Sequence, residues 1–321
     1  MKQGSWASLT LIYLYGVVSA ASLTKAIPLQ VHISSLPGAS PALFGLFISL
    51  MAVLPAIFGT VSGAVIDRLG ARPALMLAAL IGALVNGLYL VAPSFLSFQV
   101  IRVLEGAVPL LVYAAAPALM IATSAPQRRS GAMALWSSYT PVGTSLGLLI
   151  SAAFAAGEQW RSAYLAHGAI FVLLALLGLA LPRTVTASAA AGPRRSILGL
   201  LRSREGMAPL RLACAFGVLI LLGLGVSVVM PPYLSRHFAI TIAAASTIMA
   251  VTNVVMILGS TLSGVLLSRG VSAANLFLGL GVVGSIAGFL ASSAQLTGWR
   301  EARPVPELRS ACVPPRWVPA R

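Results

Sequence analysis

The amino-acid sequence predicts an all-α membrane protein. Of its 321 residues, 58% are hydrophobic and only 8% are charged, whereas soluble domains carry about 25% charged residues. Apolar runs of about 20 residues, long enough to cross a bilayer, recur along the chain, and the basic residues lie mostly between them. A water-soluble fold cannot bury that much apolar surface. The placement of the cations also argues against nucleic-acid binding, which a net charge of +15 would otherwise suggest.

We expect nine membrane-crossing helices. The first is too long for the apolar core of a signal peptide and has no small-residue cleavage site followed by a soluble domain, so we expect it to be retained. The nine runs cover residues 6–28, 42–66, 73–92, 95–122, 131–156, 161–181, 209–231, 242–267 and 272–292.

The charged connections predict the orientation. Basic residues accumulate in alternate connections, which is the pattern of cytoplasmic loops in membrane proteins. The opposite side carries only Arg161 and Arg236 up to the end of the last span. We therefore expect a multi-pass protein of a bacterial-type inner membrane with a cytoplasmic N-terminus. The cations on the cytoplasmic side are Lys2, Arg68, Arg72, Arg128, Arg129, Arg183, Arg194, Arg195, Arg202, Arg204, Arg211 and Arg269.

A flexible, basic stretch divides the spans into two groups. We expect an N-terminal six-helix bundle at 1–182, a cytoplasmic central loop at 183–208 and a partial C-terminal bundle of three helices at 209–292. A weak repeat supports this division, because Ser62-Gly63 and Asp67-Arg68 align with Ser263-Gly264 and Ser268-Arg269 at one offset. Many transporters are built from two such halves.

The segment 293–321 has a different composition. It is rich in Arg and Pro and lacks an apolar period. After nine spans it would lie outside, where its arginines contradict the charge rule that the other loops obey. The expectation is that a shifted reading frame or a premature end replaced three further spans.

The connection between the second and third spans carries two glycines and several charges. It resembles the signature Gly-x-x-x-Asp-Arg-x-Gly-Arg-Arg of the major facilitator superfamily, with Ala71 in place of one arginine. The resemblance implies the helical bundle of that family, here a six-helix half plus an incomplete half, and a charged gating loop that stabilises one access state. The alternative is a plain polar turn. The residues of the motif are Gly63, Asp67, Arg68, Gly70 and Arg72.

Three charged residues lie within the apolar runs. Arg102 and Glu105 in the fourth span share one helix face, and a charge at this depth costs about 2.5–3.5 kcal/mol on the insertion scale. They form either a substrate or coupling site or a mutually neutralising pair. Lys25, near the outer end of the first span, either snorkels to the headgroups or makes the cavity positive and favours an anionic substrate. In the second case Lys25→Met should abolish uptake without lowering membrane abundance.

The fifth span contains Pro141, Gly143 and Gly147. Proline loosens backbone hydrogen bonding and glycines allow close helix approach, so we expect a kinked, closely packed helix. The segment partly resembles the antiporter signature of the superfamily, although Thr140 replaces the glycine before the proline.

Neither a catalytic triad, a metal-ligand set nor a phosphate-binding loop is evident, so we expect no enzyme activity, metal or cofactor. His167 lies alone in the sixth span, where we expect it to hydrogen-bond a neighbouring helix.

The resemblance implies a secondary active transporter of a small solute that works by alternating access. It points to the group that moves small organic or inorganic anions, including cyanate-transporter-like members, with protons as a possible second partner. Two alternatives remain at this point. One is a proton-coupled exporter of drugs or metabolites, and the other is a non-transporting truncated remnant.

Overall fold

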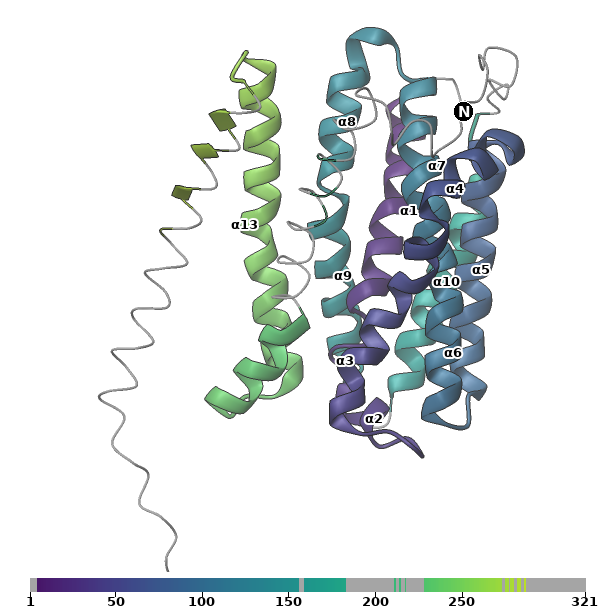
Figure 1. Ribbon diagram of the computed structural model, residues 1–321, viewed down its shortest axis with the longest axis vertical. Coiled ribbons are helices and arrows are strands. Elements are labelled where there is room, and N and C mark those ends of the chain that lie inside the picture. Colours follow the sequence, from purple (N-terminus) through teal and green to yellow (C-terminus); the bar gives the residue numbers. More distant parts are fainter. Residues whose placement is uncertain are drawn as a thin grey trace, which may run out of the picture. The chain divides into compact units, whose positions relative to one another are not determined.

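The computed structural model describes residues 5–155, 159–182 and 228–272, with residues 211, 214, 217, 275–276, 278–279, 282–283 and 286. Every regular element within this part of the chain is a helix, which confirms the predicted fold class. Figure 1 shows the long helices of residues 6–178 running side by side. The helices are α1 (Trp6–Thr24), α2 (Gln30–Ser34), α3 (Pro41–Ser49), η1 (Leu50–Ala52), α4 (Val53–Leu69), α5 (Ala71–Val91), α6 (Phe95–Glu105), α7 (Ala107–Thr123), η2 (Pro126–Arg128), α8 (Arg129–Ser137), α9 (Tyr139–Ala153), α10 (Trp160–Gly178) and α13 (Ile242–Ser268).

Six helical stretches in the described residues are long and apolar enough to cross a membrane. They correspond to the first, second, third, fourth, sixth and eighth predicted spans. Most of the expected spans 209–231 and 272–292, the central loop 183–208 and the tail 293–321 lie outside the described residues. The stretches are Trp6–Thr24, Leu43–Leu69, Ala71–Val91, Phe95–Thr123, Trp160–Gly178 and Ile242–Gly259.

Three predicted spans contain local breaks. A 3₁₀ turn, η1, interrupts the second span, and Gly106 separates α6 from α7 in the fourth. A Cβ at Gly106 would collide with the backbone carbonyl of Met51, so glycine is required where this junction meets η1. The fifth span divides at Ser138 into α8 and α9, which explains why neither piece is long enough to cross a bilayer alone.

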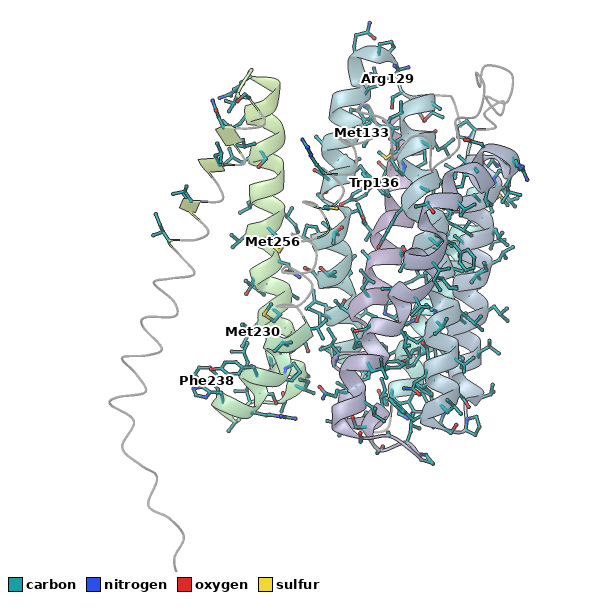
Figure 2. The ribbon with its side chains drawn as sticks, viewed as in Figure 1. Arg129, Met133, Trp136, Met230, Phe238 and Met256 are labelled. Carbon is teal, nitrogen blue, oxygen red and sulfur yellow. The ribbon has the colours of Figure 1, made fainter. Side chains whose placement is uncertain are left out.

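The α8–α9 break is held by aromatic packing. Arg129, Met133 and Trp136 follow one another along α8 (Figure 2). The Trp136 ring stacks on Tyr139 across the break, with 4.3 Å between centroids. A Cβ on Gly16 would lie 2.6 Å from the same ring, so α8 approaches α1 closely at this glycine.

Helix α1 is the most enclosed of the candidate spans. In its 18-residue apolar stretch 72% is buried, whereas the corresponding value for Leu43–Leu69 is 17%. It packs mainly on α9 and α7, while α10 packs on α5 and α5 on α7. Three apolar clusters lie among the described residues. The first surrounds Tyr15 and Trp136, and the second surrounds Phe47, Tyr89 and Phe98. The third, smaller cluster joins Ile27 and Leu148 to Met249 and Ala250 of α13. The charged residues of the fourth span lie beside the second cluster.

The residues up to Gly264 form one compact unit that includes most of α13. One face of α13 is buried, formed by Ala245, Ser246, Met249, Ala250 and Asn253. The Ser145 hydroxyl of α9 donates to the Ala250 carbonyl at 3.2 Å. Met256, which Figure 2 labels, is exposed, and so are Leu258 and Leu262 further along the helix.

The second unit begins at Val265. Shortly after the end of α13, Gly270 adopts φ +90°, a left-handed conformation that favours glycine. Gly70 adopts φ +90° directly after α4. Each of the two segments that the sequence repeat aligns is therefore followed by a glycine with positive φ.

Candidate functional site

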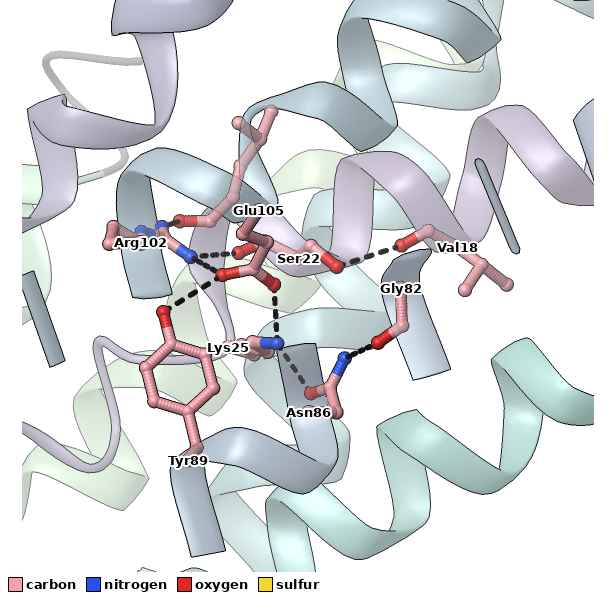
Figure 3. A network of polar contacts seen from close by, with 9 residues as sticks. Val18, Ser22, Lys25, Gly82, Asn86, Tyr89, Arg102 and Glu105 are labelled. Atoms are coloured by element: carbon pink, nitrogen blue, oxygen red, sulfur yellow. Dashed lines mark hydrogen bonds and ion pairs between the residues drawn. The ribbon is translucent and has the colours of Figure 1, made fainter. Parts of the chain in front are cut away.

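Lys25, Arg102 and Glu105 converge in the interior of the first unit. Lys25 lies directly after α1, and Arg102 and Glu105 lie in the last turn of α6. The Lys25 ammonium donates to Glu105 Oε1 at 2.5 Å, and Arg102 Nη1 donates to Glu105 Oε2 at 2.8 Å. Their side chains are at most 1% exposed. Figure 3 shows the carboxylate between the two cations. Two cations against one carboxylate leave one net positive charge.

Arg102 also caps the end of α1. Its Nη1 donates to the carbonyl of Ser22 at 2.8 Å, and its Nη2 donates to the carbonyl of Leu23 at 3.0 Å. The last four carbonyls of a helix lack partners within the helix and carry its negative end. The guanidinium therefore supplies hydrogen-bond donors to two carbonyls at the end of α1 and places a positive charge at the negative end of the helix. It also fixes the position of Lys25, which lies just beyond this end.

Helix α5 contributes two neutral residues, Asn86 and Tyr89. Asn86 Oδ1 accepts from the Lys25 ammonium at 2.6 Å, while its Nδ2 donates to the Gly82 carbonyl at 2.7 Å. The Tyr89 hydroxyl donates to Glu105 Oε2 at 3.1 Å. All these contacts appear in Figure 3. Sequence reasoning missed both residues, although their spacing places them on one face of an otherwise apolar helix.

Aromatic rings enclose the two cations. The Lys25 ammonium lies 5.4 Å from the ring centroid of Tyr89 and 5.1 Å from that of Tyr164, which belongs to α10. The Arg102 guanidinium lies 5.4 Å from the Phe47 ring. Such distances allow cation–π attraction, which grows when the cation is desolvated. We call the set Lys25, Asn86, Tyr89, Arg102 and Glu105 the ionic cluster.

The snorkelling interpretation of Lys25 is wrong. A snorkelling lysine keeps its ammonium in the headgroup region, whereas this side chain is 1% exposed and bonded to Asn86 and Glu105. The interpretation of Arg102 and Glu105 as an isolated neutralising pair is also incomplete, because Glu105 is shared with Lys25.

The charged residues of the gating-loop motif do not lie together in one ion-paired group. Arg72 reaches the end of α10, where its Nη2 donates to the Leu179 carbonyl at 2.8 Å and its Nε to the Gly178 carbonyl at 3.2 Å. Asp67 and Arg68 are exposed. The ion pairs found within the described residues are those of Glu105, and Asp67 has none there.

The glycines of this motif differ in role. A Cβ on Gly63 would meet no atom within 4 Å, so this face of α4 is open in the described part of the chain. Gly70 caps α4 in its left-handed conformation, and its amide donates to the Ile66 carbonyl at 2.7 Å. The turn between α4 and α5 therefore depends on Gly70.

The fifth-span motif lies where α9 contacts α1. Pro141 lies in the first turn of α9, just after the break at Ser138. Gly143 and Gly147 follow one turn apart, and a Cβ on either would collide with a backbone carbonyl of α1. Small residues allow such close approach of membrane helices.

His167 does not hydrogen-bond a neighbouring helix as the sequence led us to expect. It is 1% exposed, and neither of its ring nitrogens has a hydrogen-bond partner among the described residues.

Comparison with known proteins gives one family match. The family model described as Major Facilitator Superfamily matches residues 11–301. A direct sequence comparison with curated proteins gives no match.

Two solved structures resemble the chain in fold. A bacterial homologue of the human lysosomal transporter Spinster, in an inward-facing and unoccupied conformation, is 20% identical with a TM-score of 0.59, and the match covers 83% of this chain and 64% of that one. The human organic anion transporter MFSD10 (TETRAN) is 18% identical with a TM-score of 0.61, over 80% of this chain and 71% of that one. The chain thus spans less than two thirds of the first of these proteins.

Proposed function

Because the chain belongs to the Major Facilitator Superfamily, we propose that it is a secondary active transporter that carries a small anion by alternating access. The observation that carries the anion assignment is the single net positive charge of the ionic cluster, which is buried in the bundle. An uncompensated charge in a low-dielectric interior costs several kcal/mol. A small monoanion bound at the cluster offsets that cost, whereas a cation adds to it.

The geometry favours Lys25 as the group that meets the substrate. Arg102 is tied to two carbonyls of α1 as well as to Glu105, so its guanidinium is held by the backbone. Among the described residues, the Lys25 ammonium bonds to two side-chain oxygens, Oδ1 of Asn86 and Oε1 of Glu105, and to no backbone carbonyl. An incoming anion can therefore replace Glu105 on Lys25 while Glu105 keeps its contacts with Arg102 and Tyr89.

The contact between α9 and α13 supports alternating access. The buried residues of α13 lie in its N-terminal half, between Ala245 and Asn253, and the described residues after Asn253 are not buried. In the orientation that the charge pattern favours, with a cytoplasmic N-terminus in an inner-type membrane, this half lies toward the outside. The contact would then close the outer end of the path.

Uptake by the full chain in proteoliposomes tests the proposal. Radiolabelled cyanate, nitrate, formate, acetate and L-lactate are compared with neutral glycerol, and rates are normalised to the amount of reconstituted protein. Cyanate is included because the sequence resembles the cyanate-transporter-like group. We expect saturable uptake of at least one anion and none of glycerol.

Lys25→Met is the diagnostic variant, and Lys2→Met is its matched control because these are the two lysines of the chain. We expect Lys25→Met to lower anion uptake at least tenfold and Lys2→Met to leave it unchanged. Equal uptake by Lys25→Met and the unmodified chain would refute the role of the cluster. Absence of saturable uptake for every anion would refute the transport proposal itself.

A further inference from the structure

Two polar groups on α10 are buried without partners. Tyr164 and His167 are each 1% exposed, and they lie three residues apart on one face of the helix. Neither the Tyr164 hydroxyl nor either nitrogen of His167 has a hydrogen-bond partner among the described residues. Buried polar side chains are nearly always hydrogen-bonded, and each unpaired group costs about 1–3 kcal/mol. Their burial needs an explanation that the described residues do not supply.

Both groups lie beside the ionic cluster. The Tyr164 ring is 4.4 Å from the Tyr89 ring and 5.1 Å from the Lys25 ammonium. A Cβ built on Gly168, the residue after His167, would lie 3.3 Å from Cβ of Asn86. The unpaired groups therefore adjoin the position where the substrate anion would bind Lys25.

The chemistry of the two groups limits what can satisfy them. A neutral imidazole offers one N–H donor and one nitrogen acceptor, and a phenol hydroxyl both donates and accepts. A simple anion has only acceptors, so it leaves the imidazole acceptor unpaired. A ligand that satisfies both must also carry a donor.

We propose that Tyr164 and His167 bind the hydroxyl group of a substrate whose carboxylate binds Lys25. This inference rests on the proposed function, since it takes the anion at the ionic cluster as given. It identifies the substrate class as a small monocarboxylate that bears a hydroxyl group near its charge. The carboxylate offsets the net charge of the cluster, and the hydroxyl pairs the groups that α10 leaves unsatisfied.

The test compares two acids of similar size, L-lactate and propionate, which differ by one hydroxyl. Binding to the purified full chain in detergent is measured by titration calorimetry. A hydroxyl that satisfies buried groups contributes about 1–3 kcal/mol, so we expect L-lactate to bind about 10- to 100-fold more tightly than propionate.

Two variants remove the groups separately. Tyr164→Phe deletes only the hydroxyl, and His167→Leu replaces the imidazole with an apolar side chain of similar size. We expect each to reduce the preference for L-lactate to within about threefold while propionate still binds. Because the groups have no protein partner among the described residues, the thermal stability of the free variants should not fall. Tyr113→Phe is the matched control, because Tyr113 packs against the apolar cluster around Tyr15 and Trp136, and it should keep the preference.

The outcomes separate this inference from the proposed function. Equal binding of the two acids by the unmodified chain, or an unchanged preference in both α10 variants, overturns the assignment of Tyr164 and His167. If Lys25→Met nevertheless abolishes binding of both acids, the proposed function stands. Binding of neither acid also overturns the hydroxycarboxylate assignment, while Lys25-dependent uptake of another anion would leave the transport proposal intact.

Discussion

At the residue scale, Glu105 determines whether the interior of the bundle can hold its charges. It is the acceptor for both buried cations and for the Tyr89 hydroxyl. Removing one partner from a buried ion pair destabilises a protein by about 3–5 kcal/mol, because the remaining charge is uncompensated. Here two cations depend on one carboxylate.

Glu105→Gln should therefore lower the stability of the purified protein by about 3–5 kcal/mol. The measurement is the thermal unfolding midpoint in detergent. Asp67→Asn is the matched control, since Asp67 is exposed and has no ion pair within the described residues. The midpoint of this variant should equal that of the unmodified chain. The double variant Lys25→Met with Glu105→Gln removes one cation as well, so it should lose less than the sum of the single variants. If the stability losses of the two single variants add up in the double variant, Glu105 does not stabilise the protein through its ion pair with Lys25.

The sequence identified the charged members of the cluster and missed its neutral members for a physical reason. Charges within an apolar run cost enough free energy to demand a function or a partner, so Lys25, Arg102 and Glu105 were apparent. Asn86 and Tyr89 are uncharged, so their burial costs less free energy than that of a charge, and their roles depend on contacts between helices far apart in sequence. His167 was apparent but misinterpreted, because the sequence does not say whether a neighbouring helix offers it a partner.

At the element scale, Gly147 sets the approach of α9 to α1. A Cβ at this position would lie 2.5 Å from Thr24 Oγ1 and would collide with the Ala21 carbonyl. Thr24 in turn donates to the Thr144 carbonyl at 2.8 Å, which ties the two helices together beside the ionic cluster. Separation of the helices at this point would also displace Lys25.

Gly147→Ala should destabilise the protein by about 1–3 kcal/mol, the usual cost of overpacking. Gly59→Ala makes the same substitution on α4, where a Cβ meets no atom within 4 Å, and should be tolerated. The thermal midpoint of each purified variant provides the measurement. A Gly147→Ala protein as stable as Gly59→Ala would contradict the close α1–α9 contact.

At the same scale, Arg72 should stabilise the protein, because it joins the start of α5 to the end of α10. Arg72→Gln removes two charge-assisted hydrogen bonds to the carbonyls of Gly178 and Leu179, so we expect a loss of about 1–3 kcal/mol in unfolding free energy. Arg68→Gln removes the same charge from an exposed position nearby and should have little effect. If denaturant unfolding shows equal losses of unfolding free energy for both variants, the hydrogen bonds from Arg72 to the end of α10 do not stabilise the protein.

Apolar length predicted the six described stretches that are long enough to cross a membrane, because crossing a bilayer requires a fixed number of apolar residues. The short helix α2 was not predicted. The interruptions at Leu50–Ala52, Gly106 and Ser138 were not predicted. They depend on tertiary contacts, such as the approach of Gly106 to Met51 and the stacking of Trp136 on Tyr139. Pro141 marked the fifth span as irregular, but the break falls before the proline.

At the scale of the whole molecule, the contact between α9 and α13 links the two groups of spans that the sequence repeat distinguishes. Asn253 Nδ2 of α13 donates to Thr144 Oγ1 of α9 at 3.3 Å. Hydrogen bonds between membrane helices are worth about 0.6 kcal/mol on average. A contact of this strength is weak enough to break and re-form in the transport cycle that we propose, in which two bundles rock against each other.

A reversible cross-link at this contact should stop transport. Thr144→Cys with Asn253→Cys is made in a background of Cys214→Ser and Cys312→Ser, which removes both native cysteines, and is joined with a short bifunctional methanethiosulfonate. We expect anion uptake in proteoliposomes to fall at least tenfold after cross-linking and to recover with a reductant.

The matched control is Tyr13→Cys with Ser138→Cys, which joins α1 to the residue between α8 and α9 within the first group of spans, where the native side chains lie 3.0 Å apart. These helices belong to one bundle, so their cross-link should leave uptake unchanged. If the α9–α13 cross-link forms and transport continues at the full rate, the two helices do not separate during the cycle. The outer end of the path would then have to open elsewhere, and the rocking of two bundles would not describe this protein.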